Sequence, residues 1–591
     1  VIDLDAGIYD YPGKDVWTFV RVENDTLITG YKMSSGWAKT RTVYFAMSFN
    51  KSIADYGHKR LDDEDYKGFW RRFDQENDFP EMAGRQLVLW TDFNLEGTPL
   101  EVKVALSPTG IDGALLNLQT EASGKSFAQI KEGAEQKWSH ELNRIELSMM
   151  SDEDVSVFRT AQYHACLGPT LYNDVDGRYR GVDQRDHHGF DSWGSFNNYT
   201  TFSLWDTYRA LHPWLNLYQP ERNLDMCRAM LAHQDQSVHD MLPIWSHHAN
   251  ENWCMIGYHS VSVLADAIAK GVIQDPSMAE AALQASVETA QMDSFDGLGL
   301  YKKIGYVPCE RVGASVSKTL EMSYDDWCIS EIAQTLENTG IQQEFDTRKI
   351  NYRNNWDGST GFMRPRFTDG TFRDNFDVLS THGQGFIEGN AWNYSLHVAQ
   401  DVPWLIEAHG GKERFVEHLD SLFTMKLPEE AIAHSEDVTR DGIIGNYVHG
   451  NEPSHHVAWM FSEAGRPDLT EYWTRNIIST MYGPGVNGLC GNDDAGQMSA
   501  WYLFASLGFY PMCPGDSKYI LGSPSVVDAS IDLGDGKTFK VSTENQSPEN
   551  VYVQSVTLNG VLLERNYIEH EEIALGVDLR FVLGPNPKTI Q

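Results

Sequence analysis

The sequence is poor in cysteine and in basic residues, and it has no long apolar run. Its seven cysteines show no CxxC spacing and most lie in apolar segments, so we expect buried small side chains rather than a zinc site or a disulfide framework. The 47 basic and 84 acidic residues give a net charge of −37, which repels the phosphates of nucleic acid. No segment approaches the roughly 20 apolar residues of a membrane span, and no signal-peptide pattern follows Val1. We expect a globular protein with neither a nucleic-acid partner nor a membrane span.

Aromatic residues, by contrast, are abundant. The 591 residues include 17 tryptophans and 26 tyrosines. Most large aromatic side chains belong to cores, but the faces of Trp and Tyr rings are also the surfaces against which sugar rings stack. The composition therefore points toward a carbohydrate partner without identifying one.

Short runs with alternating apolar residues fill residues 1–125, as in Val16–Val22 and Leu100–Leu106. This period of two, with turn residues between the runs, predicts an antiparallel β-sandwich. The first residues already follow the pattern, so we expect a preceding part of the same sheet to be missing from this sequence. Residues 126–150 are polar with helical spacing and predict a linking helix.

Apolar residues recur with helical spacing from residue 151 to residue 510, and glycine or proline stop signals divide this stretch. Long loops rich in Gly, Asp, His, Asn and Trp alternate with short ones, which predicts an (α/α)6 toroid with its functional loops on one face. The expected helices span 152–168, 201–218, 221–236, 254–270, 277–291, 317–337, 342–355, 389–409, 412–424, 453–465, 467–482 and 495–508. The long loops span 169–200, 237–253, 292–316, 356–388, 425–452 and 483–494.

Residues 511–591 return to strand patterns and predict a small C-terminal β unit. Asn559-Gly560 lies between two such runs. Since both central residues of a type I′ turn need a positive φ, this dipeptide predicts a two-residue hairpin.

Two loops that lead into helices carry carboxylates suited to acid–base chemistry. Glu388 lies just before an expected helix among apolar neighbours, which favour the protonated form that a general acid needs. A helix cap explains the same residue equally well. Asp493 and Asp494 precede the last expected helix, where one acid can cap the helix while the other faces the mouth of the toroid. One acid from each loop would supply the two carboxyl groups of glycoside hydrolysis.

Two further stretches combine acids with aromatic or imidazole groups. Glu452 lies near the paired histidines His455 and His456, a combination that also occurs in zinc sites. Hard oxygen donors dominate these loops, however, and no HExxH occurs, so calcium fits better than zinc. Asp206 and Arg209 form either an ordinary helix pair or, with Trp205, a hydroxyl acceptor beside a sugar-stacking face.

Six collinear motifs resemble glycoside hydrolase family 92. They are EGNAW at 388–392, HGNEPSHH at 449–456, GNDDAGQMSAWY at 491–502, SLWDTYRALHP at 203–213, DVDGRYRG at 174–181 and CMIGYH at 254–259. The resemblance implies a bacterial, calcium-dependent exo-α-mannosidase that inverts the anomeric configuration and is periplasmic or secreted. Its substrates would be mannan or N-glycans, with α-1,2 linkages favoured.

By the same resemblance, Glu388 corresponds to the general acid and Asp494 to the general base. The family often has a second acid two positions before the base, where this chain has Asn492, so Asp493 and Asn492 both remain candidates for the assisting group. The candidate substrate-binding residues are Trp205, Asp206, Asn451, Glu452, His455 and Trp245. The candidate calcium ligands are Asn390, Asn393, Glu452 and Asp494.

Two other functions share this architecture, because a fold alone does not choose the chemistry. One is another (α/α)6 carbohydrate enzyme, such as a glycoside phosphorylase or a polysaccharide lyase. The other is a glycan-binding protein without catalysis. The six motifs favour the hydrolase over the first alternative, and the presence of both Glu388 and Asp494 favours it over the second.

Overall fold

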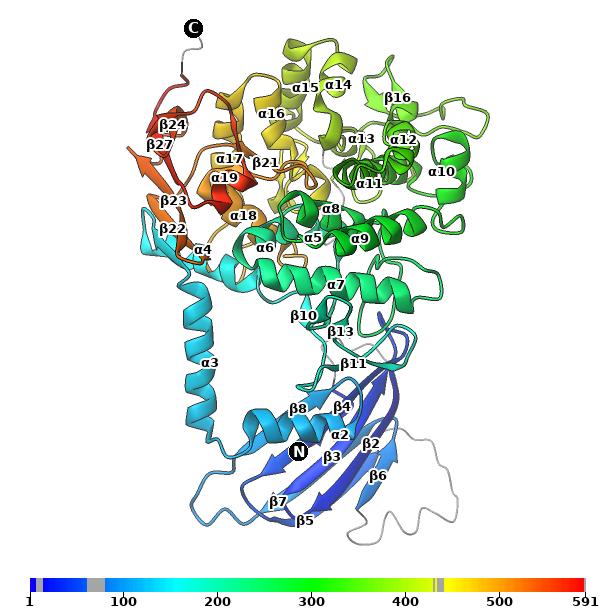
Figure 1. Ribbon diagram of the computed structural model, residues 1–591, viewed down its shortest axis with the longest axis vertical. Helices are drawn as coiled ribbons and strands as arrows, with labels where there is room; N and C mark the ends of the chain where they lie inside the picture. The colour runs from blue at the N-terminus through cyan, green and yellow to red at the C-terminus, as the bar shows by residue number, and fades with distance from the viewer. Residues whose placement is uncertain (7–13, 61–79, 429–430, 433–439, 589–591) are drawn as a thin grey trace. The chain divides into compact units, whose positions relative to one another are not determined.

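The computed structural model describes residues 1–6, 14–60, 80–428, 431–432 and 440–588 (Figure 1). These residues form two compact units. The first unit contains Val1–Ser139, Thr170–Thr201 and Trp245–Trp253, and the second contains His140–Pro169, Phe202–Ile244 and the described residues from Cys254 onward. The segment boundaries expected at residues 125, 150 and 510 remain predictions.

The first unit contains the predicted β-sandwich. One sheet has the strand order β6-β2-β3-β4-β8 and the other has the order β1-β7-β5. Val20, Ile28 and Phe45 of the first sheet pack with Leu87 and Leu89 of the second in one buried cluster. The strands are β1 (Ile2–Asp3), β2 (Asp15–Asn24), β3 (Leu27–Ser34), β4 (Arg41–Phe49), β5 (Ile53–Arg60), β6 (Glu81–Gly84), β7 (Leu87–Phe93) and β8 (Val102–Ser107).

Three small two-stranded sheets within 170–201 also belong to the first unit, and a buried carboxylate anchors this segment. The Asp174 carboxylate accepts hydrogen bonds from Ser107 Oγ at 2.9 Å and Asn117 Nδ2 at 2.8 Å. It has no exposed surface, so these neutral donors satisfy it inside the unit. The first acid of the DVDGRYRG motif therefore has a structural role. The strands are β10 (Thr170–Leu171), β11 (Arg178–Arg180), β12 (Asp186–His188), β13 (Phe190–Asp191), β14 (Gly194–Ser195) and β15 (Tyr199–Thr200), in which β10 pairs with β15, β11 with β12 and β13 with β14.

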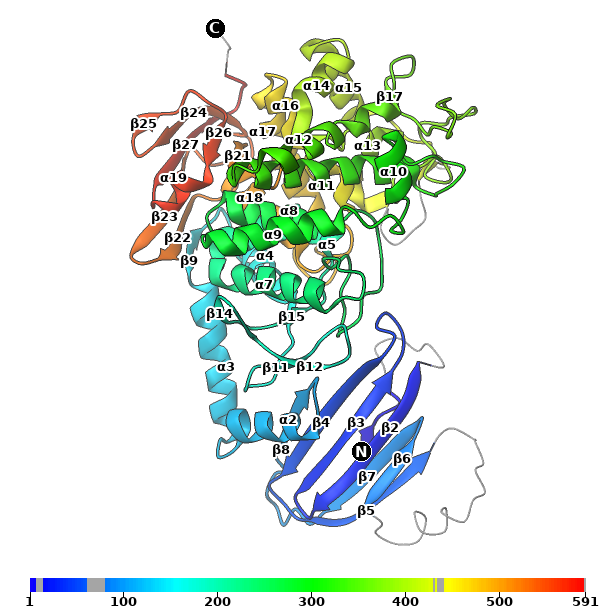
Figure 2. The same ribbon diagram turned by 45° about the vertical axis from the view of Figure 1, so that its right-hand side comes forward.

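The second unit carries the helices, and each of the twelve predicted helical stretches contains helix. The buried helix α11 packs against α8, α9 and α12 (Figure 2). The helices are α4 (Asp152–His164), α5 (Leu204–Thr207), α6 (Leu211–Tyr218), α7 (Pro220–Gln236), α8 (Ser260–Ala269), α9 (Pro276–Thr289), α11 (Ser315–Thr335), α12 (Thr339–Arg348), α13 (Ala391–Tyr394), α14 (Val402–Ala408), α15 (Lys412–Thr424), α16 (Met460–Glu463), α17 (Pro467–Met481) and α18 (Gln497–Leu507). The predicted helical catalytic fold is confirmed, with some helices broken.

The breaks have local causes. The predicted helix 389–409 divides into α13 and α14, since Pro403 near the start of α14 cannot continue a helix. The predicted helix 254–270 begins only at Ser260, because Met255 and Gly257 have positive φ angles of 62° and 74°. The predicted loop 292–316 contains a short helix, α10 (Leu298–Ile304). Part of the predicted loop 425–452 lies outside the described residues.

The C-terminal strands form the predicted β unit within the second unit. A six-stranded sheet has the order β25-β24-β27-β23-β22-β9. Asn559 and Gly560 join β24 to β25 with φ angles of 51° and 79°, which confirms the predicted turn. The strands are β9 (Ile145–Ser148), β22 (Asp528–Gly534), β23 (Lys537–Glu544), β24 (Tyr552–Leu558), β25 (Val561–Leu562) and β27 (Asp578–Gly584).

The predicted linking helix is present but shorter than expected. Helix α3 (Phe127–Leu142) ends before β9, whose four residues are too few to show a strand period.

All seven cysteines are free, but only Cys227, Cys328 and Cys513 are buried, so the expectation of general burial is wrong for the other four. Among the described residues no helix is both long and apolar enough to span a bilayer.

Candidate active site

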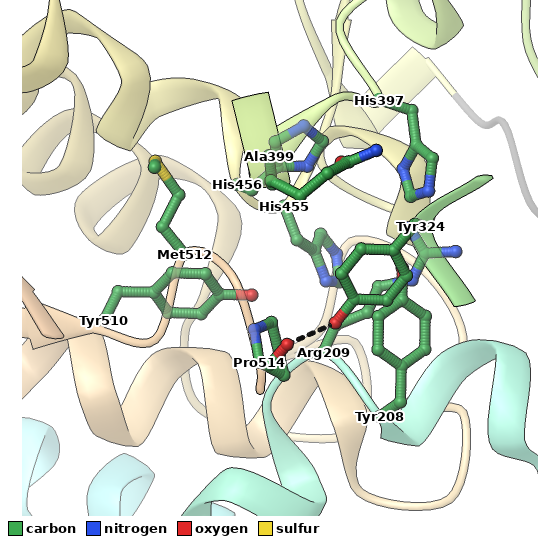
Figure 3. A pocket seen from close by; sticks show the side chains of 11 residues that line it. Tyr208, Arg209, Tyr324, His397, Ala399, His455, His456, Tyr510, Met512 and Pro514 are labelled. Carbon is green, nitrogen blue, oxygen red and sulfur yellow. Dashed lines mark hydrogen bonds between the residues drawn. The ribbon is translucent and has the colours of Figure 1, made fainter. Parts of the chain in front are cut away.

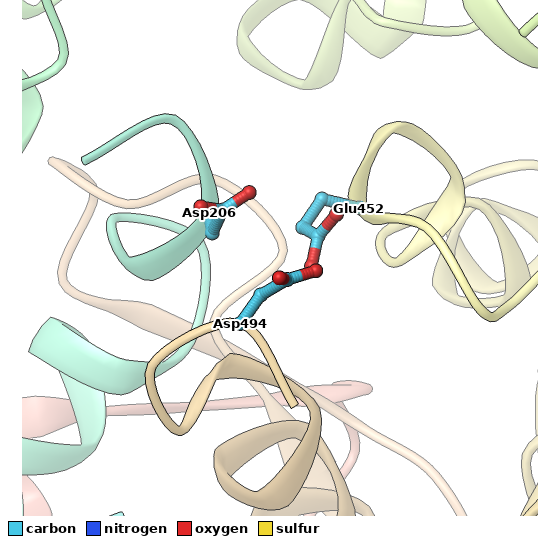
Figure 4. Close-up of side chains that lie close together, drawn as sticks. All are labelled: Asp206, Glu452 and Asp494. Carbon is cyan, nitrogen blue, oxygen red and sulfur yellow. The ribbon is translucent and has the colours of Figure 1, made fainter. Parts of the chain in front are cut away.

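Three carboxylates from distant parts of the sequence meet within the second unit (Figure 4). Asp206 lies on α5, Glu452 begins a 3₁₀ turn (Glu452–Ser454), and Asp494 lies in the loop before α18. One oxygen of each lies within 4.8 Å of the others. Asp206 and Glu452 are buried and Asp494 is half-buried. From the sequence, Asp206 is expected either to pair with Arg209 on a helix or to contact a sugar, so its place in a carboxylate cluster is new.

The electrostatics of this cluster disfavour three ionised carboxylates unless a cation or protons balance them. Burial raises the pKa of Asp206 and that of Glu452 well above their ordinary values, and the charge of Asp494 raises both further. Arg209 acts in the opposite direction but does not offset the burial. Within the described part of the chain, the Glu452 oxygens accept no hydrogen bond from an N–H or hydroxyl donor, and the side chain lies instead against the Asp494 carboxyl group, which raises the pKa of Glu452. Buried, closely spaced oxygens of this kind fit a hard divalent cation such as Ca²⁺.

Glu388 is connected to the same site through Asn451. The side-chain amide of Asn451 donates to Glu388 Oε2 at 3.2 Å and to the Glu388 carbonyl oxygen at 3.0 Å. The Asn451 Oδ1 atom accepts a hydrogen bond from the backbone N–H of Glu452. The charge of Glu388 also contributes to the raised pKa of Asp206. The structure thus brings Glu388 and Asp494 into one constellation.

The backbone at both carboxylates is in an uncommon conformation. Glu388 and Asp494 each have a φ of 46°, and Ala495 has a φ of 57°. Non-glycine residues in this left-handed region cost about 1–3 kcal/mol each and concentrate at functional sites. Fifteen other non-glycine residues of the described chain also have a positive φ, so this conformation accompanies the two carboxylates but does not by itself identify them.

Asp493 faces a different neighbour from Asp494. Its Oδ1 atom accepts hydrogen bonds from the N–H and the hydroxyl of Ser499 at 3.0 and 2.7 Å. Burial raises the pKa of Asp493, and these hydrogen bonds lower it in part. Asp493 therefore ties the loop to α18, whereas Asp494 reaches the cluster. Asn492 is exposed.

The two asparagines proposed as calcium ligands form a helix cap. Asn390 Oδ1 accepts from the N–H groups of Trp392 and Asn393, and Asn393 Oδ1 accepts from the N–H of Asn390. Their amide groups donate to Asn446, at 3.2 Å to Oδ1 and 2.5 Å to the carbonyl oxygen. This geometry favours a structural role, and Asp206 is the stronger ligand candidate.

Three proposed sugar contacts have other surroundings. Trp205 is only 3% exposed and donates its indole N–H to a buried glutamate, so its ring is packed inside the unit, and stacking on a sugar stays a prediction without support from this geometry. His455 is buried, with one ring nitrogen bonded to the His449 carbonyl oxygen and the other to Gln497. Because burial lowers its pKa to about 3, His455 is a neutral structural group. Trp245 belongs to the first unit, where it stacks on Trp37 at 5.8 Å.

Asn446 follows Gly445 in a tight turn. We expect Gly445 to be intolerant of substitution. Gly445 has a φ of 64°, and a Cβ there would lie 2.5 Å from backbone atoms of Leu422 and Phe423. Gly445→Ala should therefore destabilise the protein by about 2 kcal/mol or more. Urea unfolding measures this change. Gly361→Ala is the control, because its φ is 76° but no atom lies within 4 Å of its Cβ position. Equal losses would show that backbone strain alone, without the clash, accounts for the effect.

The acidic cluster also predicts a pH-dependent response to calcium. Asp206 and Glu452 bind protons more tightly in the folded state, so in a chelator Tm should fall as pH rises above their ordinary pKa values of 3.8 and 4.5. Calcium bound at the cluster would remove this penalty, and the rise in Tm on adding Ca²⁺ should then be larger at about pH 7.5 than at about pH 5. Differential scanning calorimetry measures both effects.

The control for this prediction is the double variant Asp206→Asn/Glu452→Gln. It should lose the calcium response and keep only the background pH dependence of groups elsewhere, such as Glu471, whose pKa burial raises to about 8. An unchanged calcium response in the double variant would place the ion at another site.

Comparisons with known proteins agree with these observations. The profile of the glycosyl hydrolase family 92 catalytic domain matches residues 113–585, and that of the family 92 N-terminal domain matches residues 1–107. A protein of Arthroderma benhamiae described as an uncharacterized secreted glycosidase is 27% identical over 532 residues, which cover 82% of this chain and 61% of that protein. The chain thus spans about three fifths of that relative's length.

Two solved structures from Bacteroides thetaiotaomicron are similar over 97% of this chain. A family 92 α-mannosidase in complex with mannoimidazole has 39% identity and a TM-score of 0.89, with 74% of its chain covered. A family 92 inverting mannosidase has 29% identity and a TM-score of 0.85, with 77% of its chain covered. The two profiles, these likenesses and the strained carboxylate site lead to one conclusion: the chain belongs to glycosyl hydrolase family 92.

Proposed function

We propose that this protein is an exo-acting α-mannosidase that hydrolyses terminal α-linked mannose with inversion, assisted by Ca²⁺, and that it favours α-1,2 linkages in mannan or N-glycans. The observation that carries the proposal is the constellation of Glu388, Asn451, Glu452, Asp206 and Asp494 in a chain of family 92. The similar structures described as an α-mannosidase and an inverting mannosidase support the substrate and the stereochemistry.

In the proposed reaction, Glu388 and Asp494 divide the proton transfers. Glu388 donates its proton to the glycosidic oxygen as the bond from that oxygen to the anomeric carbon breaks. Asp494 accepts a proton from a water molecule whose oxygen bonds to the opposite face of that carbon. The amide of Asn451 donates to Glu388 Oε2 and so orients the acid toward the leaving oxygen. Neither carboxyl group becomes covalently bound to the sugar.

The residues that would hold the metal are Asp206, Glu452 and Asp494. Their oxygens are hard donors at mutually short distances, as Ca²⁺ requires. When bound, Ca²⁺ would supply positive charge to vicinal sugar hydroxyls and favour a flattened ring. Asp206 and Glu452 would serve only the ion, whereas Asp494 would also accept the proton of the attacking water.

Release of free mannose from yeast mannan, with and without EDTA, tests the function. The proposal predicts mannose release that EDTA stops and Ca²⁺ restores better than Zn²⁺. A product that appears only with added phosphate would indicate a phosphorylase, an unsaturated product a lyase, and binding without release a lectin. Each of these outcomes, or full activity after exhaustive chelation, would contradict the corresponding part of the proposal.

We also propose that the protein acts outside the cytoplasm, in the periplasm or as a secreted enzyme. The description of the Arthroderma benhamiae relative as secreted supports this location. Fractionation of the producing cells, followed by immunodetection, tests it.

A further inference from the structure

A fully buried glutamate lies behind the candidate active site on α11. Glu321 has no exposed surface. Its Oε1 atom accepts hydrogen bonds from Trp205 Nε1 at 3.1 Å and from Tyr394 Oη at 2.9 Å. Its Oε2 atom lies 3.0 Å from His259 Nε2 and 3.1 Å from His397 Nε2. Both oxygens of this carboxylate therefore face polar groups from other parts of the chain.

Glu321 is ionised despite its burial. Burial by itself raises the pKa of Glu321, but interactions with His397, Arg209 and His259 outweigh it and hold that pKa well below its ordinary value. An ionised group buried to this degree is tolerated only where several partners compensate for lost hydration. Moving any of these partners away would therefore leave the buried carboxylate without full compensation.

These partners belong to the segments that carry the active-site carboxylates. Trp205 immediately precedes Asp206. Tyr394 closes α13, the helix that follows Glu388. Arg209 Nη2 lies 3.6 Å from Glu321, and Arg209 Nη1 donates to the carbonyl oxygen of Glu452 at 3.3 Å. One carboxylate thus connects three separate segments of the site.

The charge of Arg209 depends on Glu321 for its balance. Figure 3 shows Arg209 beside Tyr208 and His397 in the lining of a small pocket. The guanidinium lies 4.9 Å from the centroids of the Trp205 and Tyr208 rings, and its Nε donates to the Trp205 carbonyl oxygen, so Glu321 adds a counter-charge to a group that packing already holds. Without the negative charge of Glu321, the acidic groups left near Arg209 would include Asp206 and Glu452. The positive charge of Arg209 lowers the pKa of both.

A second cation is shared by Glu321 and the next turn of α11. His259 Nδ1 lies 2.8 Å from Asp325 Oδ1, and Tyr208 stacks on the His259 ring at 4.4 Å. Burial lowers the pKa of His259, but Asp325 and Glu321 together raise it to about 9. The ion pair is therefore formed at neutral pH. Its His259 ring stacks on Tyr208, the residue that precedes Arg209 in the sequence.

We propose that Glu321 is a positioning residue of this active site, which fixes the segments bearing Asp206, Glu388 and Glu452 relative to one another. This inference rests on the proposed function for its effect on catalysis. Glu321 touches neither the carboxylate cluster nor a bound sugar in this scheme. It acts through Trp205, Arg209 and Tyr394.

The test compares Glu321→Gln with Asp326→Asn. Asp326 lies on the same helix with no exposed surface, and it accepts hydrogen bonds from Tyr258 at 2.8 Å and Tyr301 at 2.7 Å and pairs with Arg348 at 2.8 Å. Each substitution keeps the side-chain size and removes one buried charge. The partners of Asp326 carry none of the active-site carboxylates, so this variant controls for general destabilisation.

Hydrogen–deuterium exchange without substrate gives the first readout. Glu321→Gln should speed exchange in residues 203–209, 388–394 and 451–454, whereas Asp326→Asn should leave these segments unchanged. The second readout is a fall in kcat of about 10- to 100-fold for Glu321→Gln, with KM changed less than kcat. Glu321→Asp keeps the charge and should recover part of kcat.

Two results would overturn the proposal: equal exchange in the three segments for both variants, or equal losses of kcat. If the wild-type protein releases no mannose, the proposed function fails, and the exchange comparison still decides whether Glu321 holds the three segments together.

Discussion

Glu388→Gln should lose about 10²- to 10⁴-fold in kcat on mannan and on alkyl mannosides, because the leaving oxygen then receives no proton. Mannosides with a highly activated aryl leaving group should show a much smaller loss, since such a group leaves with little protonation. Glutamine preserves the size of the side chain and can still meet the Asn451 amide, whose bond to Glu388 Oε2 is 3.2 Å. Binding of substrate should therefore remain. Steady-state kinetics on the two substrate types measures the difference.

An exposed glutamate supplies the control for this experiment. Glu407 lies on the exposed face of α14, and Glu407→Gln should change neither rate. Equal losses on activated and unactivated substrates in Glu388→Gln would assign Glu388 to binding or structure and would remove it from the acid role.

Asp494→Asn should lose at least as much activity as Glu388→Gln, on both kinds of substrate, because the attacking water loses its proton acceptor whatever the leaving group. Asparagine is the appropriate substitute. It has nearly the shape of aspartate and tolerates the left-handed backbone, with the φ of 46°, that Asp494 adopts. The loss should therefore reflect the missing carboxylate rather than a refolded loop.

Asp493→Asn is the matched comparison one residue away. Asp493 is bound to Ser499, so this substitution should lower stability more than catalysis. If Asp493→Asn abolished turnover while Asp494→Asn remained active, the base would be Asp493, and the reading of the cluster around Asp206 and Glu452 would have to change.

The sequence predicts the larger architecture because periodicity reports it directly. A period of two identifies the sandwich strands and a period of 3.6 identifies the helices, and both patterns are set by which face is buried. The breaks at Met255 and Gly257, by contrast, depend on single backbone angles. Strand β9 joins a sheet whose other strands lie more than 370 residues later, a pairing that four residues cannot reveal.

The same distinction applies to the candidate site: local patterns can be found in the sequence, whereas contacts between distant residues cannot. Glu388 and Asp494 are found from their loops and motifs, and the structure brings them together. The roles of Asp206 and Trp205 depend on distant partners, so the sequence alone leaves them open between a helix pair and a sugar contact.

Glu321 was missed altogether, although one signal existed. Helix α11 is buried nearly all round, yet it contains Glu321, Asp325 and Asp326. Acids in such a helix require partners, and their presence marks a network even where the partners cannot be named.

The anomer of the first sugar released tests the central claim most directly. If Asp494 activates water and no covalent sugar–enzyme bond forms, cleavage of an α-mannoside must first release β-mannose. Proton NMR spectra recorded in the first minutes of reaction, before mutarotation, distinguish the two anomers. The account predicts that the β-anomer signal appears first and the α-anomer signal grows only later. Initial release of α-mannose would contradict the inverting mechanism and, with it, the assignment of Glu388 and Asp494 as acid and base.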